Sequence, residues 1–271
     1  MNKKRLIISL LAIITVVGAT VGSYVYRDTI YSRIARTAAV VSGQEIKPLL
    51  DSESRYIRQI VVQDNSTSRT IMWQSDSSEA DAVIEYRLAG SENTQTIGAT
   101  DKAFTDDGST TYIHEGTLTG LTPKTKYEYR VGYSSDRRSD WYSLETAGAS
   151  VYDVLIYPDS QSGDYSQWEQ IVKDSAHRNP RTALYISMGD LVDNGEQDYQ
   201  WRTWLNSIRP LSATVPLATT LGNHEMYTLD WKMREPYAYL NYFAVPPNGN
   251  EIFNRRYYSY DFGDVHYVVL D

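Results

Sequence analysis

The sequence predicts three parts: an N-terminal apolar helix, an all-β sandwich, and a partial α/β unit. Three observations support this division. Residues 6–26 carry no charge, residues 55–147 contain short runs that alternate apolar and polar residues, and residues 151–271 alternate strand-like and helix-like segments. The hydrophobic content of 41% is sufficient for packed cores.

Residues 1–26 are interpreted as a signal anchor or a signal peptide. Lys3, Lys4 and Arg5 precede an apolar stretch that is long enough to cross a bilayer as a helix. The two alternatives stay open, because the small residues 17–19 form a cleavage site although the apolar run continues to Tyr26. Both place the rest of the chain at the cell membrane with extracellular domains, or secreted. Residues 27–54 show no clear period and are interpreted as a linker.

Composition excludes several classes of function. The formal net charge of -8 argues against nucleic acid as a partner, because nucleic-acid binders usually carry a basic face. The chain has no cysteine, which excludes disulfides, thiolate metal sites and cysteine nucleophiles. The oligomeric state is not indicated.

Residues 55–147 predict a β-sandwich with strands at 57–63, 69–75, 82–88, 112–121, 126–133 and 141–147. Trp73 lies on an early strand where a core tryptophan is expected, and Tyr127 has the position of a tyrosine corner. His114 is interpreted as an exposed strand residue without chemistry. The segment resembles a fibronectin type III domain, and the resemblance is carried by Leu121, Pro123, Tyr127, Tyr129 and Val131.

Residues 151–271 predict parallel strands joined by helices. A buried strand is expected at 151–157 and further strands at 182–188 and 214–221, with helices at 166–176 and 196–211. A Tyr- and Pro-rich loop at 234–250 then leads to a hairpin at 255–271, whose turn is formed by Gly263 and Asp264.

Polar residues follow each of the three expected parallel strands. Because the carboxyl ends of parallel strands meet at one edge of a sheet, these side chains are expected to converge. Taken alone, each would more often be a turn residue or a helix cap. Three successive clusters instead predict a site for cations, and the clusters are Asp159 and Gln161, then Asp190, Asp193 and Asn194, then Asn223, His224 and Glu225.

Three of these blocks resemble the motifs of the calcineurin-like metallophosphoesterases: Asp159, the pair Gly189 and Asp190, and residues 222–225. The preceding sandwich and the closing hairpin resemble the purple acid phosphatase branch of that superfamily. The resemblance covers residues 57–271 and implies a hydrolase that acts on phosphoric esters of small molecules.

The resemblance also implies a role for each residue. Two metal ions, of manganese, zinc or iron, would be held by Asp159 on one side and Asn223 on the other, with Asp190 bridging them. His224 would contact the phosphate or protonate the leaving oxygen, and Glu225 would orient that histidine.

Departures from the family pattern leave an alternative open. Gln161 stands where a histidine is common, so it could ligate a metal through its carbonyl oxygen or hold a water, and Asp193 stands where purple members have a tyrosine. The family's three later ligand histidines have no counterpart, because His266 is interpreted as a structural strand residue, while His177 is interpreted as a surface residue. The phosphoesterase domain at 151–271 is therefore expected to be incomplete at its C-terminus. The alternative is a non-catalytic cell-surface binding protein with a degenerate phosphoesterase domain.

Overall fold

The computed structural model describes residues 54–78, 81–133, 137–148 and 150–271. The predicted N-terminal helix and the linker up to residue 53 lie outside this part. Within it, no helix is both long and apolar enough to cross a membrane.

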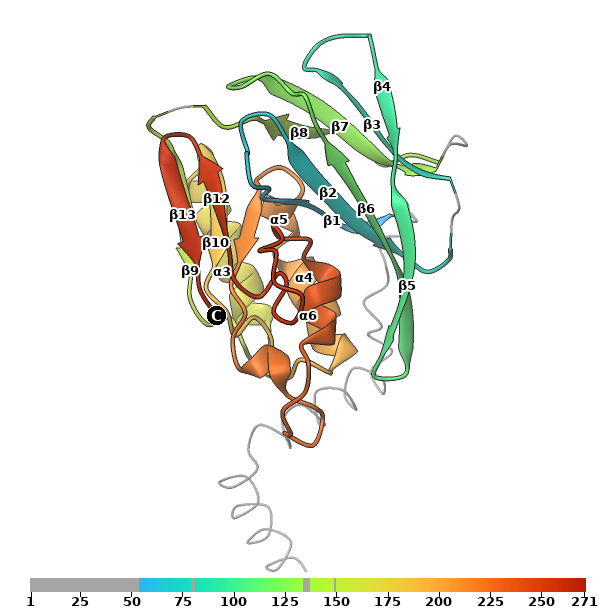
Figure 1. Ribbon diagram of the computed structural model, residues 1–271, viewed down its shortest axis with the longest axis vertical. Helices are drawn as coiled ribbons and strands as arrows, with labels where there is room; N and C mark the ends of the chain where they lie inside the picture. The colour runs from blue at the N-terminus through green and yellow to red at the C-terminus, as the bar shows by residue number, and fades with distance from the viewer. Residues whose placement is uncertain (1–53, 79–80, 134–136, 149) are drawn as a thin grey trace, which may run out of the picture.

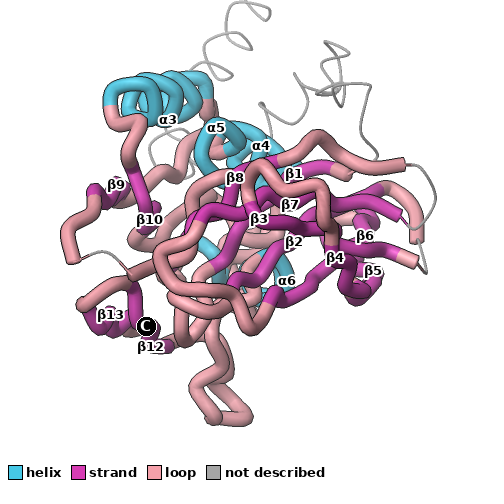
Figure 2. Tube along the Cα trace, turned by 90° about the horizontal axis from the view of Figure 1, so that it is seen from above, coloured by secondary structure: helices cyan, strands magenta, loops and turns pink. Residues whose placement is uncertain are grey.

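The first half of the described chain is a sandwich of two antiparallel sheets (Figures 1 and 2). One sheet has the order β4-β3-β7-β8, and the other contributes β5-β6-β2-β1. The strands are β1 (Arg55–Ile60), β2 (Arg69–Ser75), β3 (Ala82–Leu88), β4 (Gln95–Gly98), β5 (Thr100–Asp106), β6 (Ser109–Leu118), β7 (Lys126–Tyr133) and β8 (Tyr142–Glu145).

Apolar alternation positions the sandwich core. Trp73 of β2 is fully buried and packs in one cluster with Ile84 of β3 and Val131 of β7, as the sequence predicts. The tyrosine corner is also confirmed, because the Tyr127 hydroxyl accepts a hydrogen bond from the Thr122 backbone N–H at 3.0 Å. Strands β4 and β5 were not expected, since their side chains are mostly polar and exposed.

The interpretation of His114 as an exposed residue is wrong. Its side chain is fully buried on β6, where the ring stacks on Trp73 with centroids 5.0 Å apart. Its Nε2 atom lies 2.8 Å from the Ser75 hydroxyl. The polar contact and the aromatic neighbour compensate for removing an imidazole from water, so His114 is a core residue of the sandwich.

The second half alternates strands and helices, and its three strands β9, β10 and β11 pair in parallel, which confirms that prediction. The elements are β9 (Asp153–Tyr157), α3 (Ser166–Arg178), β10 (Thr182–Ser187), α4 (Asp198–Ser207), α5 (Arg209–Ser212), β11 (Leu217–Thr219), the 3-10 turn η1 (His224–Met226), α6 (Tyr237–Tyr242), β12 (Tyr258–Phe262) and β13 (Val265–Val269).

Three local expectations require correction. Strand β9 is an edge strand rather than a buried one, and Ile156 is 55% exposed. The single helix expected at 196–211 is broken between α4 and α5, because Pro210 has no N–H to continue the helical hydrogen bonds. The loop expected at 234–250 contains the short helix α6.

The C-terminal hairpin matches its prediction. Strands β12 and β13 pair antiparallel around the turn at Gly263 and Asp264. His266 lies on the exposed side of this hairpin with its Nδ1 atom 2.5 Å from Asp261 Oδ1, and His177 is exposed at the end of α3. Both histidines are therefore surface residues.

One sheet runs through both halves of the molecule. Its strand order is β5-β6-β2-β1-β11-β10-β9, so β1 of the sandwich pairs in parallel with β11 of the α/β unit. Ile60 is opposite Leu217, and the Val61 N–H donates to the Leu217 carbonyl at 3.1 Å. The two halves are therefore joined by backbone hydrogen bonds as well as by side chains.

Buried polar groups add to this junction. The Arg58 guanidinium of β1 is fully buried and donates to the carbonyl of Tyr242, the last residue of α6, at 2.7 and 2.9 Å. Burial lowers the pKa of Arg58 to about 10, so the side chain stays charged at neutral pH. The Tyr129 hydroxyl donates to the Ala213 carbonyl at 2.7 Å. Side chains of the sandwich thus donate hydrogen bonds to carbonyl groups of the α/β unit.

Replacing Tyr127 with phenylalanine tests the tyrosine corner. The change leaves the Thr122 N–H without its acceptor, so the free energy of unfolding should fall by about 1–2 kcal/mol. Chemical denaturation measures this loss. The control is Tyr86→Phe, whose hydroxyl bonds only the Gln95 side chain and should matter less. Equal losses in both variants would contradict a special role for the corner.

Candidate functional site

A buried carboxylate organises the carboxyl ends of β10 and β11. Glu225 in η1 is fully buried, and its two oxygens accept hydrogen bonds from four backbone N–H groups. Oε1 accepts from Leu191 at 2.7 Å and Val192 at 3.2 Å, whereas Oε2 accepts from Asp190 at 3.0 Å and Gly222 at 2.8 Å. Glu225 therefore clamps the two loops together, and its expected role of orienting the His224 ring stays a prediction.

Asp190 lies where the three strand-end loops meet. Its Oδ1 atom accepts a hydrogen bond from the His224 backbone N–H at 3.0 Å. Its carbonyl accepts from the N–H groups of Ser160 and Gln161, at 3.1 and 2.9 Å. Gly222 has to be glycine here, because a Cβ atom would overlap the Asp190 carboxylate.

The backbone of Asp190 has an uncommon conformation. Its φ angle is +46°, a left-handed value that few non-glycine residues adopt, and Gly189 beside it has φ +86°. Such residues cost free energy and cluster at functional sites, where surrounding bonds hold them. The bonds from Glu225 to the N–H groups of residues 190–192 supply this restraint.

The other candidate ligands lie on the same loops. Asp159 and Asn223 are exposed, and the Asn223 amide donates to the Tyr227 hydroxyl at 3.3 Å. The Gln161 Oε1 atom is buried and has no hydrogen-bond partner among the described residues. An unpaired buried carbonyl oxygen is unfavourable by itself, so it fits a position that receives a ligand.

His224 is held by a carbonyl and two aromatic rings. Its Nδ1 atom lies 2.8 Å from the Asp193 carbonyl oxygen, and the Asp193 carboxylate is 3.7 Å from the same nitrogen. Because a carbonyl only accepts, Nδ1 carries the proton of the neutral ring and Nε2 is the nitrogen left to accept one. The rings of Tyr227 and Trp231 meet the imidazole edge to face, at centroid distances of 5.4 and 5.9 Å.

Several supporting residues were not predicted from the sequence. The Gln200 side chain of α4 accepts a hydrogen bond from the Asp193 N–H at 2.7 Å and so fixes the loop that orients His224. Gly195 leaves no room for a Cβ atom against the Glu225 backbone, which a glycine after an Asn could have suggested. Tyr227 and Trp231 belong to no recognised motif, and only the fold brings them to His224.

The donor set suits hard or borderline cations. Asp159, Asp190, Asn223 and Gln161 offer oxygen atoms of carboxylates and amides, the ligands preferred by such ions. The part of the chain described by the structure holds no group of three or more His, Cys, Asp or Glu side chains placed to bind a metal. Of the four oxygen donors named above, only Asp159 and Asp190 are of those types.

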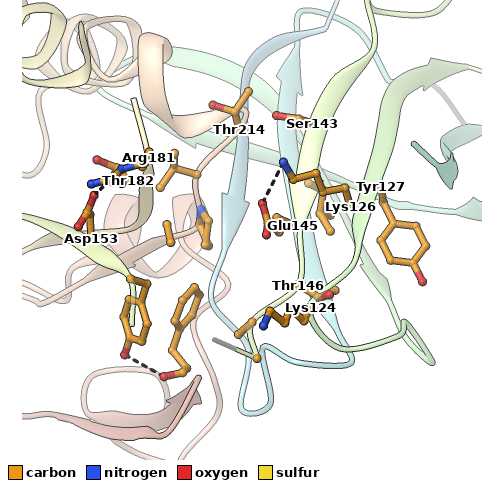
Figure 3. A pocket seen from close by; sticks show the side chains of 18 of the residues that line it. Lys124, Lys126, Tyr127, Ser143, Glu145, Thr146, Asp153, Arg181, Thr182 and Thr214 are labelled. Carbon is orange, nitrogen blue, oxygen red and sulfur yellow. Dashed lines mark hydrogen bonds and ion pairs between the residues drawn. The ribbon is translucent and has the colours of Figure 1, made fainter. Parts of the chain in front are cut away.

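A pocket of about 640 Å³ lies away from these residues (Figure 3). It opens between β7 and β8 of the sandwich and the amino ends of β9 and β10, where Asp153 and Thr182 begin their strands. Two ion pairs lie among its lining residues, Lys126 with Glu145 at 3.9 Å and Arg181 with Asp153 at 3.5 Å. This pocket lies at the amino ends of the parallel strands, whereas Asp190 follows the carboxyl end of β10.

The fold is a β-sandwich followed by parallel strands with oxygen donors at their carboxyl ends. The chain belongs to the calcineurin-like phosphoesterases that carry a purple acid phosphatase N-terminal domain. Residues 56–146 match the family described as the N-terminal domain of purple acid phosphatase, and residues 139–270 match the calcineurin-like phosphoesterases.

The chain is also similar to curated acid phosphatases. Purple acid phosphatase 23 of Arabidopsis thaliana is 28% identical over 191 residues, which cover 58% of this chain and 40% of that protein. Acid phosphatase type 7 of Mus musculus is 26% identical over 179 residues, covering 62% of this chain and 37% of that protein. This chain therefore spans less than half the length of these relatives.

The fold is similar to that of a purple acid phosphatase from yellow lupin (Lupinus luteus) seeds. The two structures have a TM-score of 0.69 at 21% sequence identity, over 81% of this chain and 45% of the lupin chain. This likeness supports the arrangement of a sandwich followed by a mixed α/β sheet.

Replacing Glu225 with alanine should destabilise the fold strongly. Four backbone N–H groups lose their acceptor inside the protein, and the free energy of unfolding should fall by roughly 3–5 kcal/mol. Denaturant titration followed by tryptophan fluorescence measures the loss. The matched control is Glu196→Ala, because the Glu196 side chain accepts one backbone N–H, that of Leu229, and otherwise makes a 3.9 Å ion pair with Arg234, so its loss should cost about 1 kcal/mol. Similar losses in the two variants would contradict the role of Glu225.

The stability of the metal-free protein should depend on pH through Glu225. Burial raises the pKa of this carboxyl from 4.5 to about 7, against the lowering effect of the backbone donors. The folded state then holds the proton more tightly than the unfolded state, so the stabilisation is complete below pH 4.5 and is lost as the pH rises through 7. The loss should approach ~3 kcal/mol.

The variant Glu225→Gln isolates this effect because its side chain does not titrate. Unfolding free energies of both proteins are compared between pH 4.5 and 8 in the presence of a chelator. The difference between them should change with pH by the amount given above. A difference that stays constant across this range would show that another group is responsible.

Proposed function

We propose that this chain is part of a metal-dependent phosphoric ester hydrolase, similar to acid phosphatases, that acts on phosphorylated small molecules. Two metal ions, of manganese, zinc or iron, would serve as cofactors. The uncharged segment at residues 6–26 supports export, either anchored in the membrane or secreted.

The observation that carries the proposal is the joining of three loops at Asp190. The Asp190 carbonyl binds the loop after β9, its N–H binds Glu225, and its carboxylate binds the loop after β11. The candidate ligands of all three loops are therefore tied to one residue. A phosphoesterase with two metal ions needs ligands from several loops held close together. In such a site the Asp190 carboxylate would bind both ions.

Each residue has a defined task in this proposal. Asp159 would hold one metal ion, Asn223 the other, and Asp190 would bind both, while Gln161 would add a carbonyl oxygen or hold a water. When bound, the pair of cations would supply an acidified water as nucleophile and neutralise charge on the phosphoryl oxygens. Glu225 keeps the loops in register without touching substrate.

His224 would act on the substrate directly. Its Nδ1–H donates to the Asp193 carbonyl, which fixes the ring and leaves Nε2 for the phosphate or the leaving oxygen. In the protonated ring, Nε2–H would deliver a proton to the departing alcohol. Assistance of this kind is worth about 10²- to 10⁴-fold in rate.

The variant Asp190→Asn tests the proposal. The amide keeps an oxygen for the His224 N–H but removes the charge, so the fold should persist while metal affinity drops at least about tenfold. Metal content is measured by elemental analysis after dialysis, and turnover with an aryl phosphate. The control is Asp153→Asn, at the other end of the same sheet, which should bind metal like the parent chain.

Two results would overturn the assignment. Unchanged metal content in Asp190→Asn would show that this residue is not a ligand. A folded parent chain that retains neither metal nor phosphate would favour the non-catalytic binding role.

A further inference from the structure

The loop that packs against His224 is fastened to the N-terminal sandwich by an ion pair. Arg234 ends the segment 227–234, which follows η1 and which we name the aromatic loop. Its guanidinium makes a two-pronged contact with the Asp106 carboxylate, with Nη1 donating to Oδ1 at 2.9 Å and Nη2 donating to Oδ2. Both side chains are about 15% exposed, so the pair is largely shielded from solvent.

Asp106 is the last residue of β5, at the tip of the β5–β6 hairpin. This hairpin extends from the sandwich along the α/β unit, with β5 beside α6 in Figure 1. Phe104 meets Tyr242 edge to face at 5.5 Å, and Lys102 donates to the Asn241 side chain at 2.7 Å. The hairpin therefore lies against the α/β unit over several residues, and Asp106 is the member that reaches the aromatic loop.

The aromatic loop has its own internal frame. Thr228 donates its N–H to the Lys232 carbonyl at 2.8 Å, and Tyr227 forms a β-bridge with Met233. This frame places the rings of Tyr227 and Trp231 5.4 Å apart and both of them against the His224 imidazole. The position of the loop thus determines which aromatic faces surround His224.

Arg234 transmits the attachment to the loop that carries Asp193. Besides the Asp106 pair, its Nη2 donates to the Gly195 carbonyl at 3.1 Å. The Glu196 side chain next to it accepts the Leu229 N–H of the aromatic loop at 2.7 Å. One guanidinium therefore joins the sandwich hairpin, the loop after β10 and the aromatic loop, and the last two both contact the His224 ring.

We propose that Asp106 and Arg234 are positioning residues for His224, and that the N-terminal sandwich thereby forms part of the active-site architecture. The hairpin holds the aromatic loop, the loop holds the imidazole between Tyr227 and Trp231, and Nε2 is kept in a fixed direction. The proposal rests on the proposed function only in assuming that His224 contacts substrate. The contacts from Asp106 through Arg234 and the aromatic loop to His224 do not depend on which reaction the protein catalyses.

The ring protons of His224 report on this arrangement. Aromatic rings at 5.4 and 5.9 Å shift the resonances of the imidazole protons, so nuclear magnetic resonance detects a displaced loop directly. The protein contains only four histidines, and His224→Gln assigns the signal. Spectra are recorded on the full chain with Zn²⁺, which is diamagnetic, at one fixed pH.

Asp106→Ala should move the His224 signals toward those of the exposed His177. Asp106→Glu keeps the carboxylate and should restore much of the original shift. The matched control is Lys102→Ala, which removes a contact of the same hairpin with α6 but none with the aromatic loop, and it should leave His224 unchanged. Where turnover is measurable, kcat of Asp106→Ala should fall on the order of tenfold at nearly constant KM.

Unchanged His224 signals in a folded Asp106→Ala variant would overturn the proposal. Equal shifts in Asp106→Ala and Lys102→Ala would also overturn it, because the hairpin as a whole would then be responsible rather than the ion pair. Should Asp106→Ala fail to fold, Asp106→Asn keeps one of the two hydrogen bonds and gives the same readout. Failure of the parent chain to bind Zn²⁺ would refute the proposed function, and the comparison of His224 signals between parent and variants would then be made on the metal-free chain.

Discussion

The candidate site depends on one buried carboxylate. Glu225 gathers four backbone N–H groups from the loops after β10 and β11, and the Asp190 carbonyl adds the loop after β9. Loop ends are ordinarily the most variable part of an α/β sheet. Here they are fixed by hydrogen bonds that leave the polar side chains of Asp159 and Asn223 exposed. Rigidity and accessibility are thus supplied by different residues.

Strands with a clear alternation were predicted well, and those without it were missed. Strands β2, β3 and β7 have the predicted bounds because one face of each packs in the sandwich core. Strands β4 and β5 bury little, so their sequences carry no alternation that could reveal them. The apolar run of β9 suggested burial on both faces, whereas its position at the sheet edge exposes Ile156. The alternation of apolar residues predicts which side chains are buried, but it does not predict which strands pair with one another in the sheet.

The same limit applies to the candidate site. The order of strands and helices was enough to bring Asp159, Asp190 and Asn223 to one edge, because parallel strands end together. The function of Glu225 as a clamp, and the contacts of Tyr227 and Trp231 with His224, depend on loop conformations. Those conformations arise from hydrogen bonds between distant segments, for which short sequence motifs give no signal.

The pairing of β1 with β11 has a consequence for the order of folding during synthesis. The sandwich emerges from the ribosome first, and its strands β1 to β8 are adjacent in the chain. Until Leu217 has been translated, β1 presents an open edge of unpaired N–H and carbonyl groups, the kind of surface that recruits strands from other chains. A nascent sandwich is therefore exposed to aggregation for the whole time needed to make α3, β10 and α4. Chaperone assistance would have its greatest effect in that interval.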